Sequence, residues 1–134
     1  MAVFEERMAT LEKGVGSLAT SSGQAAQFLA FFTFLEPGDE IVSAATLYGG
    51  TYTQFDVSFR KFGWNTRFVN PDNPDEFRRL TNNKTRAFYC ETIGNPLSNV
   101  MDVEAIAQIA HEVGVPLIVD NTFASPYLCR PLDW

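Results

Sequence analysis

The sequence is poor in basic residues, in histidine and in cysteine, and each shortage excludes a class of function. Ten Lys and Arg stand against sixteen Asp and Glu, and the formal net charge is −6. Because a phosphate backbone is bound by clustered Lys and Arg, no nucleic-acid partner is expected from these scattered ones. His111 is the single histidine, which excludes a metal site built from several histidines. Cys90 and Cys129 follow no metal-ligand spacing and are expected to be free thiols.

Long apolar runs and an N-terminal targeting pattern are also missing. No uninterrupted apolar stretch approaches the length that crosses a bilayer, so no membrane partner is expected. The acidic start, residues 1–7, is unlike a secretory signal, in which an apolar segment follows a basic one. With 46% hydrophobic and 19% charged residues, the chain is typical of a folded domain. We therefore expect a cytoplasmic location.

What the sequence does contain is an alternation of helical and strand-like segments. Helices are expected over residues 3–13, 23–35, 51–62, 74–80 and 103–113. Strands are expected over residues 18–20, 40–43, 66–69, 85–90 and 115–119. The helix over 23–35 is apolar on almost every side and is expected to be buried nearly all round, and the strand over 115–119 to be buried on both faces of a parallel sheet. This order predicts a three-layer α/β/α fold with a mainly parallel sheet, which binds ligands beyond the carboxyl ends of its strands.

Small polar residues open the expected helix at residue 23. Gly23 would let a ligand approach the backbone, and free N–H groups at a helix start hold phosphate groups. Ser21 and Ser22 carry hydroxyls that would add donors. An ordinary N-cap at Ser22 explains the same residues, and the segment alone favours that explanation.

Three further segments place polar or aromatic side chains directly after strands. Tyr48 stands beside two glycines, where its ring could lie on a flat heterocycle, although a plain turn is at least as well supported. Glu91 and Asn95 are suited to orienting a polar ligand, but Asn-Pro is also a common turn. Asp120 ends an apolar strand, where a carboxylate needs a partner; a protonated pyridine nitrogen is one such partner, and a capped loop is the alternative.

Taken together, four segments make almost the whole chain resemble a known family, the pyridoxal 5′-phosphate (PLP)-dependent enzymes of cysteine and methionine metabolism, which include cystathionine γ-synthase and γ-lyase. The segments are Ser-Ser-Gly-Gln-Ala-Ala (21–26), Leu-Tyr-Gly-Gly-Thr-Tyr (47–52), Glu-Thr-Ile-Gly-Asn-Pro (91–96) and Val-Asp-Asn-Thr-Phe (119–123). They look most like the O-acetylhomoserine sulfhydrylase branch, because Gln24 and the Ile93-Gly94 pair distinguish it from the lyases. Residues 123–127 depart from the glycine-rich version of that branch.

The resemblance implies the large domain of a fold-type I PLP-dependent transferase, with one group of residues holding the cofactor's phosphate and ring face. Gly23 and Gln24 would donate backbone N–H groups to the phosphate, beside Ser22. Tyr48 would stack on the pyridine ring and take part in proton transfer.

A second group of residues is implied at the ring edge. Asp120 would pair with the ring nitrogen, and Thr122 would lie beside the ring. Asn95 would lie near the ring hydroxyl and the substrate carboxylate, with Glu91 supporting the site. Tyr48 and Asp120 would be the catalytic residues, and no metal is implied.

The implied reaction is γ-replacement on O-acetylhomoserine, in which acetate leaves and sulfide or a thiol adds, giving homocysteine or methionine. It requires a lysine that in the family follows the Asp-Asn-Thr-Phe strand within a Ser-Ala-Thr-Lys segment. Lys13, Lys61 and Lys84 are the only lysines and are not placed to substitute. Residues 1–134 are therefore expected to be part of the PLP-binding domain, without the Schiff-base lysine segment and the C-terminal domain, and to be inactive alone.

The resemblance also implies partners and leaves alternatives open. The parent would bind a small amino-acid substrate and form a homo-oligomer, a tetramer built as a dimer of dimers. A cystathionine γ-synthase or γ-lyase type of enzyme is one alternative, and a non-catalytic partner of full-length subunits is another. A domain of the same layered architecture without PLP is a third, because fold does not fix function.

Overall fold

The computed structural model describes residues 1–134 and is built on a four-stranded sheet in the order β2-β1-β3-β4. Its strands are β1 (Glu40–Ala44), β2 (Asn65–Val69), β3 (Thr85–Glu91) and β4 (Leu117–Asp120). All three strand pairs are parallel, as predicted. The first three strands agree with the sequence prediction to within one residue at each end, and the fourth is shifted toward Asp120.

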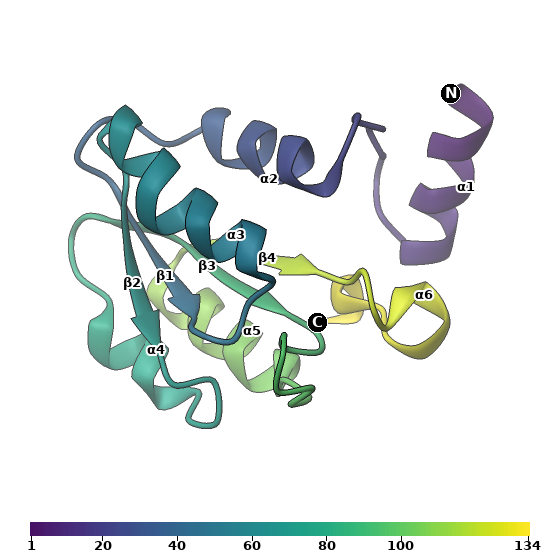
Figure 1. Ribbon diagram of the computed structural model, residues 1–134. Coiled ribbons are helices and arrows are strands. Elements are labelled where there is room, and N and C mark those ends of the chain that lie inside the picture. The colour runs from purple at the N-terminus through teal and green to yellow at the C-terminus, as the bar shows by residue number, and fades with distance from the viewer.

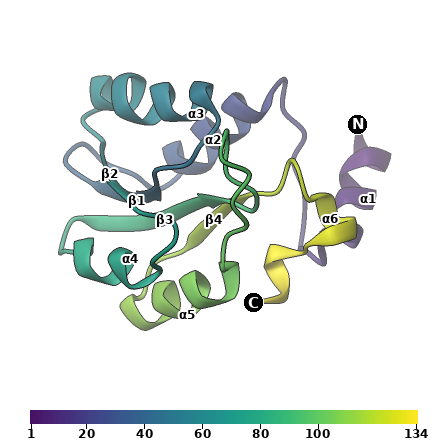
Figure 2. The ribbon, with the colours of Figure 1, turned by 60° about the horizontal axis from the view of Figure 1, so that its bottom comes forward.

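Helices cover both faces of this sheet, so the predicted three layers are confirmed (Figure 1, Figure 2). The α-helices are α1 (Ala2–Glu12), α2 (Gly23–Phe32), α3 (Gly49–Thr53), α4 (Asp75–Leu80), α5 (Val103–Val113) and α6 (Ser125–Leu128). Figure 2 shows α2 and α3 on one face, α4 and α5 on the other, and α1 and α6 beyond β4. The expected helix over 51–62 is α3 continued by a π-helical turn (Gln54–Ser58) and a 3-10 turn (Phe59–Phe62); a last 3-10 turn is Pro131–Asp133. No helix has the length and apolar character that crossing a bilayer requires.

Aromatic side chains make up much of the core between the sheet and its helices. On the α2 side, Phe55 meets the ring of Tyr89 at a centroid distance of 4.7 Å and that of Phe31 at 5.4 Å. On the other side, Phe77 of α4 packs against Phe88 of β3 at 5.2 Å. All five rings are fully buried. Because neighbouring residues of a strand point to opposite faces, Phe88 and Tyr89 tie both helical layers to the central strand β3.

Helix α5 follows the sequence signals at both ends. The Asp102 carboxylate accepts a hydrogen bond from the Ala105 N–H at 3.0 Å, and Gly114 takes the left-handed conformation just past the helix. These are the usual N-cap and C-terminal devices. At the end of α1, Lys13 takes the left-handed conformation, with φ 58°, one residue before Gly14.

Three expectations about strand content and burial are wrong. Residues 18–20 form no strand, and Leu18 is 76% exposed. The helix predicted over 23–35 ends at Phe32, and within it only Gln27 and Phe31 are buried, because the sheet covers a single side of α2. Strand β4 is half-buried and not buried on both faces, because it is an edge strand that pairs with β3 alone. The apolar character of these segments can be read from the sequence. Which neighbouring elements cover them cannot.

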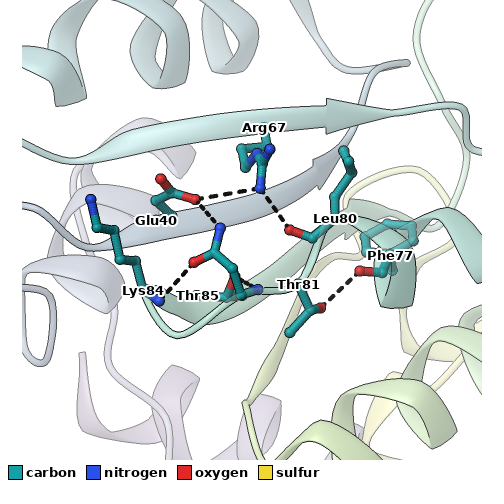
Figure 3. Close-up of polar contacts among 8 residues, drawn as sticks. Glu40, Arg67, Phe77, Leu80, Thr81, Lys84 and Thr85 are labelled. Carbon is teal, nitrogen blue, oxygen red and sulfur yellow. Dashed lines mark hydrogen bonds and ion pairs between the residues drawn. The ribbon is translucent and has the colours of Figure 1, made fainter.

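The amino end of the sheet is closed by a polar network (Figure 3). The Glu40 carboxylate accepts a hydrogen bond from the Asn82 amide at 2.8 Å and lies 3.8 Å from the Arg67 guanidinium. Arg67 also donates to the Leu80 carbonyl at 3.0 Å.

The two cysteines are free, as predicted. Burial raises the pKa of the Cys90 thiol to about 12.

Candidate active site

A pocket of about 480 Å³ opens at the carboxyl end of the sheet, where the fold class predicts a ligand site. It is lined by residues from α2 and its N-cap, from the segments that follow β1, β3 and β4, and from the last residues of β3 and β4. These residues are Ser22, Gly23, Gln24, Gln27, Tyr48, Thr51, Glu91, Ile93, Asn95, Asp120, Thr122 and Phe123. All eight site residues that the family resemblance implied are among them, although they are spread over a hundred positions of the chain; Ser21, the other hydroxyl considered as a donor, is not.

One end of the pocket is the N-terminus of α2. The Ser22 hydroxyl accepts a hydrogen bond from the Ala25 N–H at 3.1 Å, so the N-cap expected at Ser22 is present. The Ala26 N–H donates to the Ser22 carbonyl at 3.0 Å. The N–H groups of Gly23 and Gln24 have no acceptor within the protein, and both residues line the pocket. Two free donors at the positive end of a helix dipole form a seat for an anion.

The other end of the pocket holds the Asp120 carboxylate, at the last position of β4. Its Oδ1 accepts hydrogen bonds from the backbone N–H (3.0 Å) and the hydroxyl of Thr122. Its Oδ2 accepts one from the Gln27 side-chain amide at 3.3 Å. None of the twelve lining residues is Lys or Arg, so this carboxylate has no cationic partner in the pocket. A half-buried carboxylate in this state attracts a cationic ligand group.

Glu91 is a second carboxylate, beside the first, because it pairs with Asp120 in the β3–β4 register. It is only 6% exposed, and its Oε1 accepts a hydrogen bond from the Tyr48 N–H at 2.7 Å. Burial raises the pKa of Glu91 to about 7; the hydrogen bond from Tyr48 opposes this shift, and the charge of Asp120 adds to it. Near neutral pH the carboxyl of Glu91 therefore exists in both protonation states.

Tyr48 presents an aromatic ring at the pocket mouth. It is the residue before α3, and 57% of it is exposed, which leaves the ring and hydroxyl accessible. Its position depends on the small size of Gly50: a Cβ there would lie 2.5 Å from the Tyr48 ring and 2.6 Å from the Gln24 amide nitrogen. Such contacts are far shorter than van der Waals separation, so the glycine is a packing requirement.

The segment after β3 brings Asn95 to the pocket and is also held by a glycine. A Cβ on Gly94 would lie 2.3 Å from Asn99 Oδ1 and 2.6 Å from Thr46 Oγ1. The Gly94 N–H donates to the Asn99 carbonyl at 2.9 Å, which closes this turn. The predicted Asn-Pro turn is therefore present, and its Asn95 is also one of the polar residues that line the pocket.

One buried polar residue of the pocket lining, Gln27, was not predicted as a site residue. Gln27 is 8% exposed, and its amide nitrogen lies 2.7 Å from the Tyr89 hydroxyl and 3.1 Å from Thr51 Oγ1. One signal for it was available. Gln27 is a polar residue one helical turn after Gly23, within a run that is otherwise mostly Ala, Leu and Phe. A polar side chain on the buried face of a helix needs a hydrogen-bonding partner.

Comparison with known proteins places this pocket in a family context. A family model described as Cys/Met metabolism PLP-dependent enzyme matches residues 1–134. The chain is 54% identical over 133 residues to the homocysteine/cysteine synthase of Saccharomyces cerevisiae, covering 98% of the chain and 30% of that protein. It is 54% identical to the O-acetyl-L-homoserine sulfhydrylase 1 of Thermus thermophilus, covering 98% of the chain and 32% of that protein.

Solved structures show the same likeness. The O-acetylhomoserine sulfhydrylase of Wolinella succinogenes matches with a TM-score of 0.87 and 35% identity over 92% of this chain and 35% of that one. A cystathionine gamma-lyase from Lactobacillus plantarum matches with a TM-score of 0.94 and 38% identity over 98% of this chain and 34% of that one. A Campylobacter jejuni protein whose structure contains N'-pyridoxyl-lysine-5'-monophosphate also matches, with a TM-score of 0.94, 32% identity and coverage of 98% of this chain and 32% of that one. The chain thus spans about a third of the length of these proteins.

Proposed function

The chain belongs to the Cys/Met metabolism PLP-dependent enzyme family, and on that premise we propose that its pocket is the PLP site of a γ-replacing transferase. The proposed reaction replaces the acetate of O-acetylhomoserine with sulfide or a thiol and yields homocysteine or methionine. One observation carries the proposal: the pocket combines the free N–H donors of Gly23 and Gln24 with the Asp120 carboxylate, which has no cationic partner there. The names of the relatives at 54% identity support the choice of substrate.

The phosphate of PLP fits the α2 end of the pocket. Gly23 and Gln24 would donate their free N–H groups to phosphate oxygens, and the helix dipole favours the negative charge there. The Ser22 hydroxyl already accepts a bond from the helix and would add its own proton as a donor. A Cβ on Gly23 would meet nothing within 4 Å, so there is room for a ligand at the backbone.

The ring of PLP fits the β4 end. Asp120 would accept a hydrogen bond from the protonated ring nitrogen, which supplies the cation that the pocket itself lacks. Bound in this way, PLP supplies an electron sink for negative charge at the substrate carbons next to it. Thr122 fixes the carboxylate through its hydrogen bonds to Oδ1, and would lie beside the ring.

Three other residues would serve the ring and the amino-acid substrate. The exposed ring of Tyr48 would stack on the pyridine, with its hydroxyl free to take up and release a proton. Asn95 would bind the ring hydroxyl and the substrate carboxylate through its amide. Glu91 accepts the Tyr48 N–H and so holds that residue at the mouth of the pocket.

No lysine lines the pocket, and one of the three is engaged elsewhere, since the Lys13 Nζ lies 2.5 Å from Asp133. The 134-residue chain would therefore bind PLP without a covalent bond and would not turn over substrate alone. The parent would act as a homo-oligomer. The exposed Phe32 and Leu29 on α2 support this, because an exposed apolar helix face is typical of a contact surface.

Titration of the chain with PLP, followed by borohydride reduction and mass spectrometry, tests the cofactor site. We expect saturable binding without a stoichiometric adduct on Lys13, Lys61 or Lys84, and at least ten-fold weaker binding by Asp120→Ala. An exposed carboxylate changed in the same way, in Glu104→Ala, is the matched control. A stoichiometric adduct on one lysine would show that the site is misplaced.

A chimera tests the reaction. Residues 1–134 would replace the matching segment of the Thermus thermophilus sulfhydrylase, and the purified chimera would be assayed with O-acetylhomoserine plus sulfide and, separately, with cystathionine. We expect turnover of the first pair. Turnover of cystathionine alone would instead favour the lyase reaction, to which the Lactobacillus plantarum structure points.

A further inference from the structure

In the pocket lining, one buried amide connects the carboxylate at the end of β4 to the core. Gln27 lies on the inner side of α2 and is the only fully polar side chain buried in that helix. We propose that Gln27 is a positioning residue that sets which oxygen of the Asp120 carboxylate is offered to the ligand. The inference rests on the proposed function, because the ligand group in question is the ring nitrogen of PLP.

The amide nitrogen of Gln27 has two protons to donate and three oxygens within hydrogen-bond distance. Its Nε2 lies 2.7 Å from the Tyr89 hydroxyl, 3.1 Å from Thr51 Oγ1 and 3.3 Å from Asp120 Oδ2. The Thr51 hydroxyl is also 3.4 Å from Gln27 Oε1. If the amide were turned over, Oε1 would face the carboxylate and the two oxygens would repel each other. The charge of Asp120 therefore selects the orientation in which the amide donates.

The other two partners of this amide are buried and uncharged. Tyr89 is fully buried in the central strand β3, and Thr51 is 1% exposed in α3. Burial and the nearby charge of Asp120 raise the pKa of Tyr89 well above its ordinary value of 10, so the phenol keeps its proton. Neutral groups thus anchor Gln27 to the central strand β3 and to the neighbouring helix α3. The only charged group that it contacts is Asp120.

The acceptor positions of Asp120 show what this anchoring achieves. A carboxylate oxygen accepts about two hydrogen bonds. Both positions on Oδ1 are taken by the N–H and the hydroxyl of Thr122. On Oδ2, Gln27 takes one position and leaves one open. Oδ2 is therefore the oxygen that accepts the ring N–H, and Gln27 holds it in place through the same atom.

The test compares two probes that differ at the ring nitrogen alone. Pyridoxine phosphate has an alcohol in place of the aldehyde of PLP and cannot react with lysines; its carbocyclic analogue has a C–H in place of the ring nitrogen. The wild-type chain should bind pyridoxine phosphate more tightly. In Gln27→Leu the affinity for pyridoxine phosphate should fall about ten-fold, the loss typical of a hydrogen bond to a charged group, while that for the analogue changes less than about two-fold.

Two more variants separate positioning from general damage. Tyr89→Phe keeps the Gln27–Asp120 bond but removes one anchor, so it should show the same selective loss to a smaller extent. Gln108→Leu, on the exposed side of α5, is the matched control and should bind both probes like the wild type. Far-ultraviolet circular dichroism checks that each variant is folded. A nitrogen-15 label in the ring should report a protonated nitrogen in the wild type and a weakened hydrogen bond from this N–H to Asp120 in Gln27→Leu.

Each other outcome overturns a defined part of the inference. A wild-type chain that binds neither probe, or both equally, removes the ring-nitrogen contact from the proposed function, and the role of Gln27 with it. A wild-type preference that Gln27→Leu retains in full leaves the proposed function standing and refutes the positioning role. An equal loss of affinity for both probes in Gln27→Leu shows that the residue supports the pocket in general and does not act through Asp120.

Discussion

The two ends of the parallel sheet both carry acidic side chains, but the charges are treated differently. At the amino end, Glu40 lies in a network with the Arg67 guanidinium and the Asn82 amide (Figure 3). At the carboxyl end, Glu91 and Asp120 stand on adjacent strands, and no Lys or Arg lines their pocket. Backbone pairing alone does not explain the difference, because the paired parallel strands β1 and β3 run between the two ends.

This contrast separates a stabilising role from a ligand-binding one. A carboxylate with hydrogen-bond donors and a cation nearby recovers the free energy lost on leaving water. Two adjacent carboxylates without a cation do not recover it, so the folded chain without ligand is less stable than it would be without them. A cationic ligand group restores the balance. The carboxyl end therefore favours a cationic ligand group that the chain itself does not supply.

The largest effect is expected from Glu91, whose pKa is raised from the ordinary 4.5 to about 7. Between these values the folded chain binds a proton that the unfolded chain has lost, so its stability falls as the pH rises and the cost is complete above about pH 7. Glu91→Gln should remove this fall and raise the free energy of unfolding at pH 8 by roughly 2 kcal/mol, with no gain at pH 4. Urea unfolding at the two pH values measures it.

Glu40→Gln is the matched change at the amino end and should act in the opposite direction. It weakens the interaction with Arg67 and should lower the free energy of unfolding by about 1 kcal/mol at pH 8. Equal destabilisation by both substitutions would contradict the distinction between the two ends.

A smaller effect is expected when the two N-caps next to the carboxyl end are compared. Ser22→Ala and Asp102→Ala each remove one bond from a side chain to a helix N–H, at 3.1 Å and 3.0 Å, and each should cost about 1 kcal/mol of stability. Only Ser22 lines the pocket, so only Ser22→Ala should also weaken the binding of pyridoxine phosphate, as measured by titration. Weaker binding in both variants would mean that helix stability, and not a direct contact, governs affinity.

The smallest effect concerns a second ion pair at the amino end, in which Asp39 lies 3.2 Å from the Arg86 guanidinium. A double-mutant cycle of Asp39→Ala and Arg86→Met should give a coupling free energy of about 0.5 kcal/mol, because 46% of the arginine side chain is exposed and water screens the pair. Salt at about 1 M should abolish the coupling, since it shortens the screening length to a few ångströms. A coupling that persists in high salt would indicate a contact that does not depend on charge.

Much of the fold could be predicted from the chain because the relevant signals are local. The strand-like segments predicted β1, β2 and β3, and Asp102 as an N-cap marked the start of α5. Parallel strands bring their carboxyl ends to one edge, so the eight candidate residues could be expected to meet there. What local patterns could not supply was the cover over each segment. Leu18, Phe32 and β4 are more exposed than their apolar character predicts, because burial depends on which elements lie alongside.

The sequence by itself therefore determined the layered fold, the edge that carries the site and the residue types at that edge. The tertiary structure alone decided the electrostatics: that Glu91 and Asp120 are neighbours without a cation, and that Gln27 reaches Asp120 across 93 positions of the chain. The physical reason is range. Strand and helix signals act over a few residues, whereas a charge responds to every group packed within a few ångströms, and only folding brings those groups together.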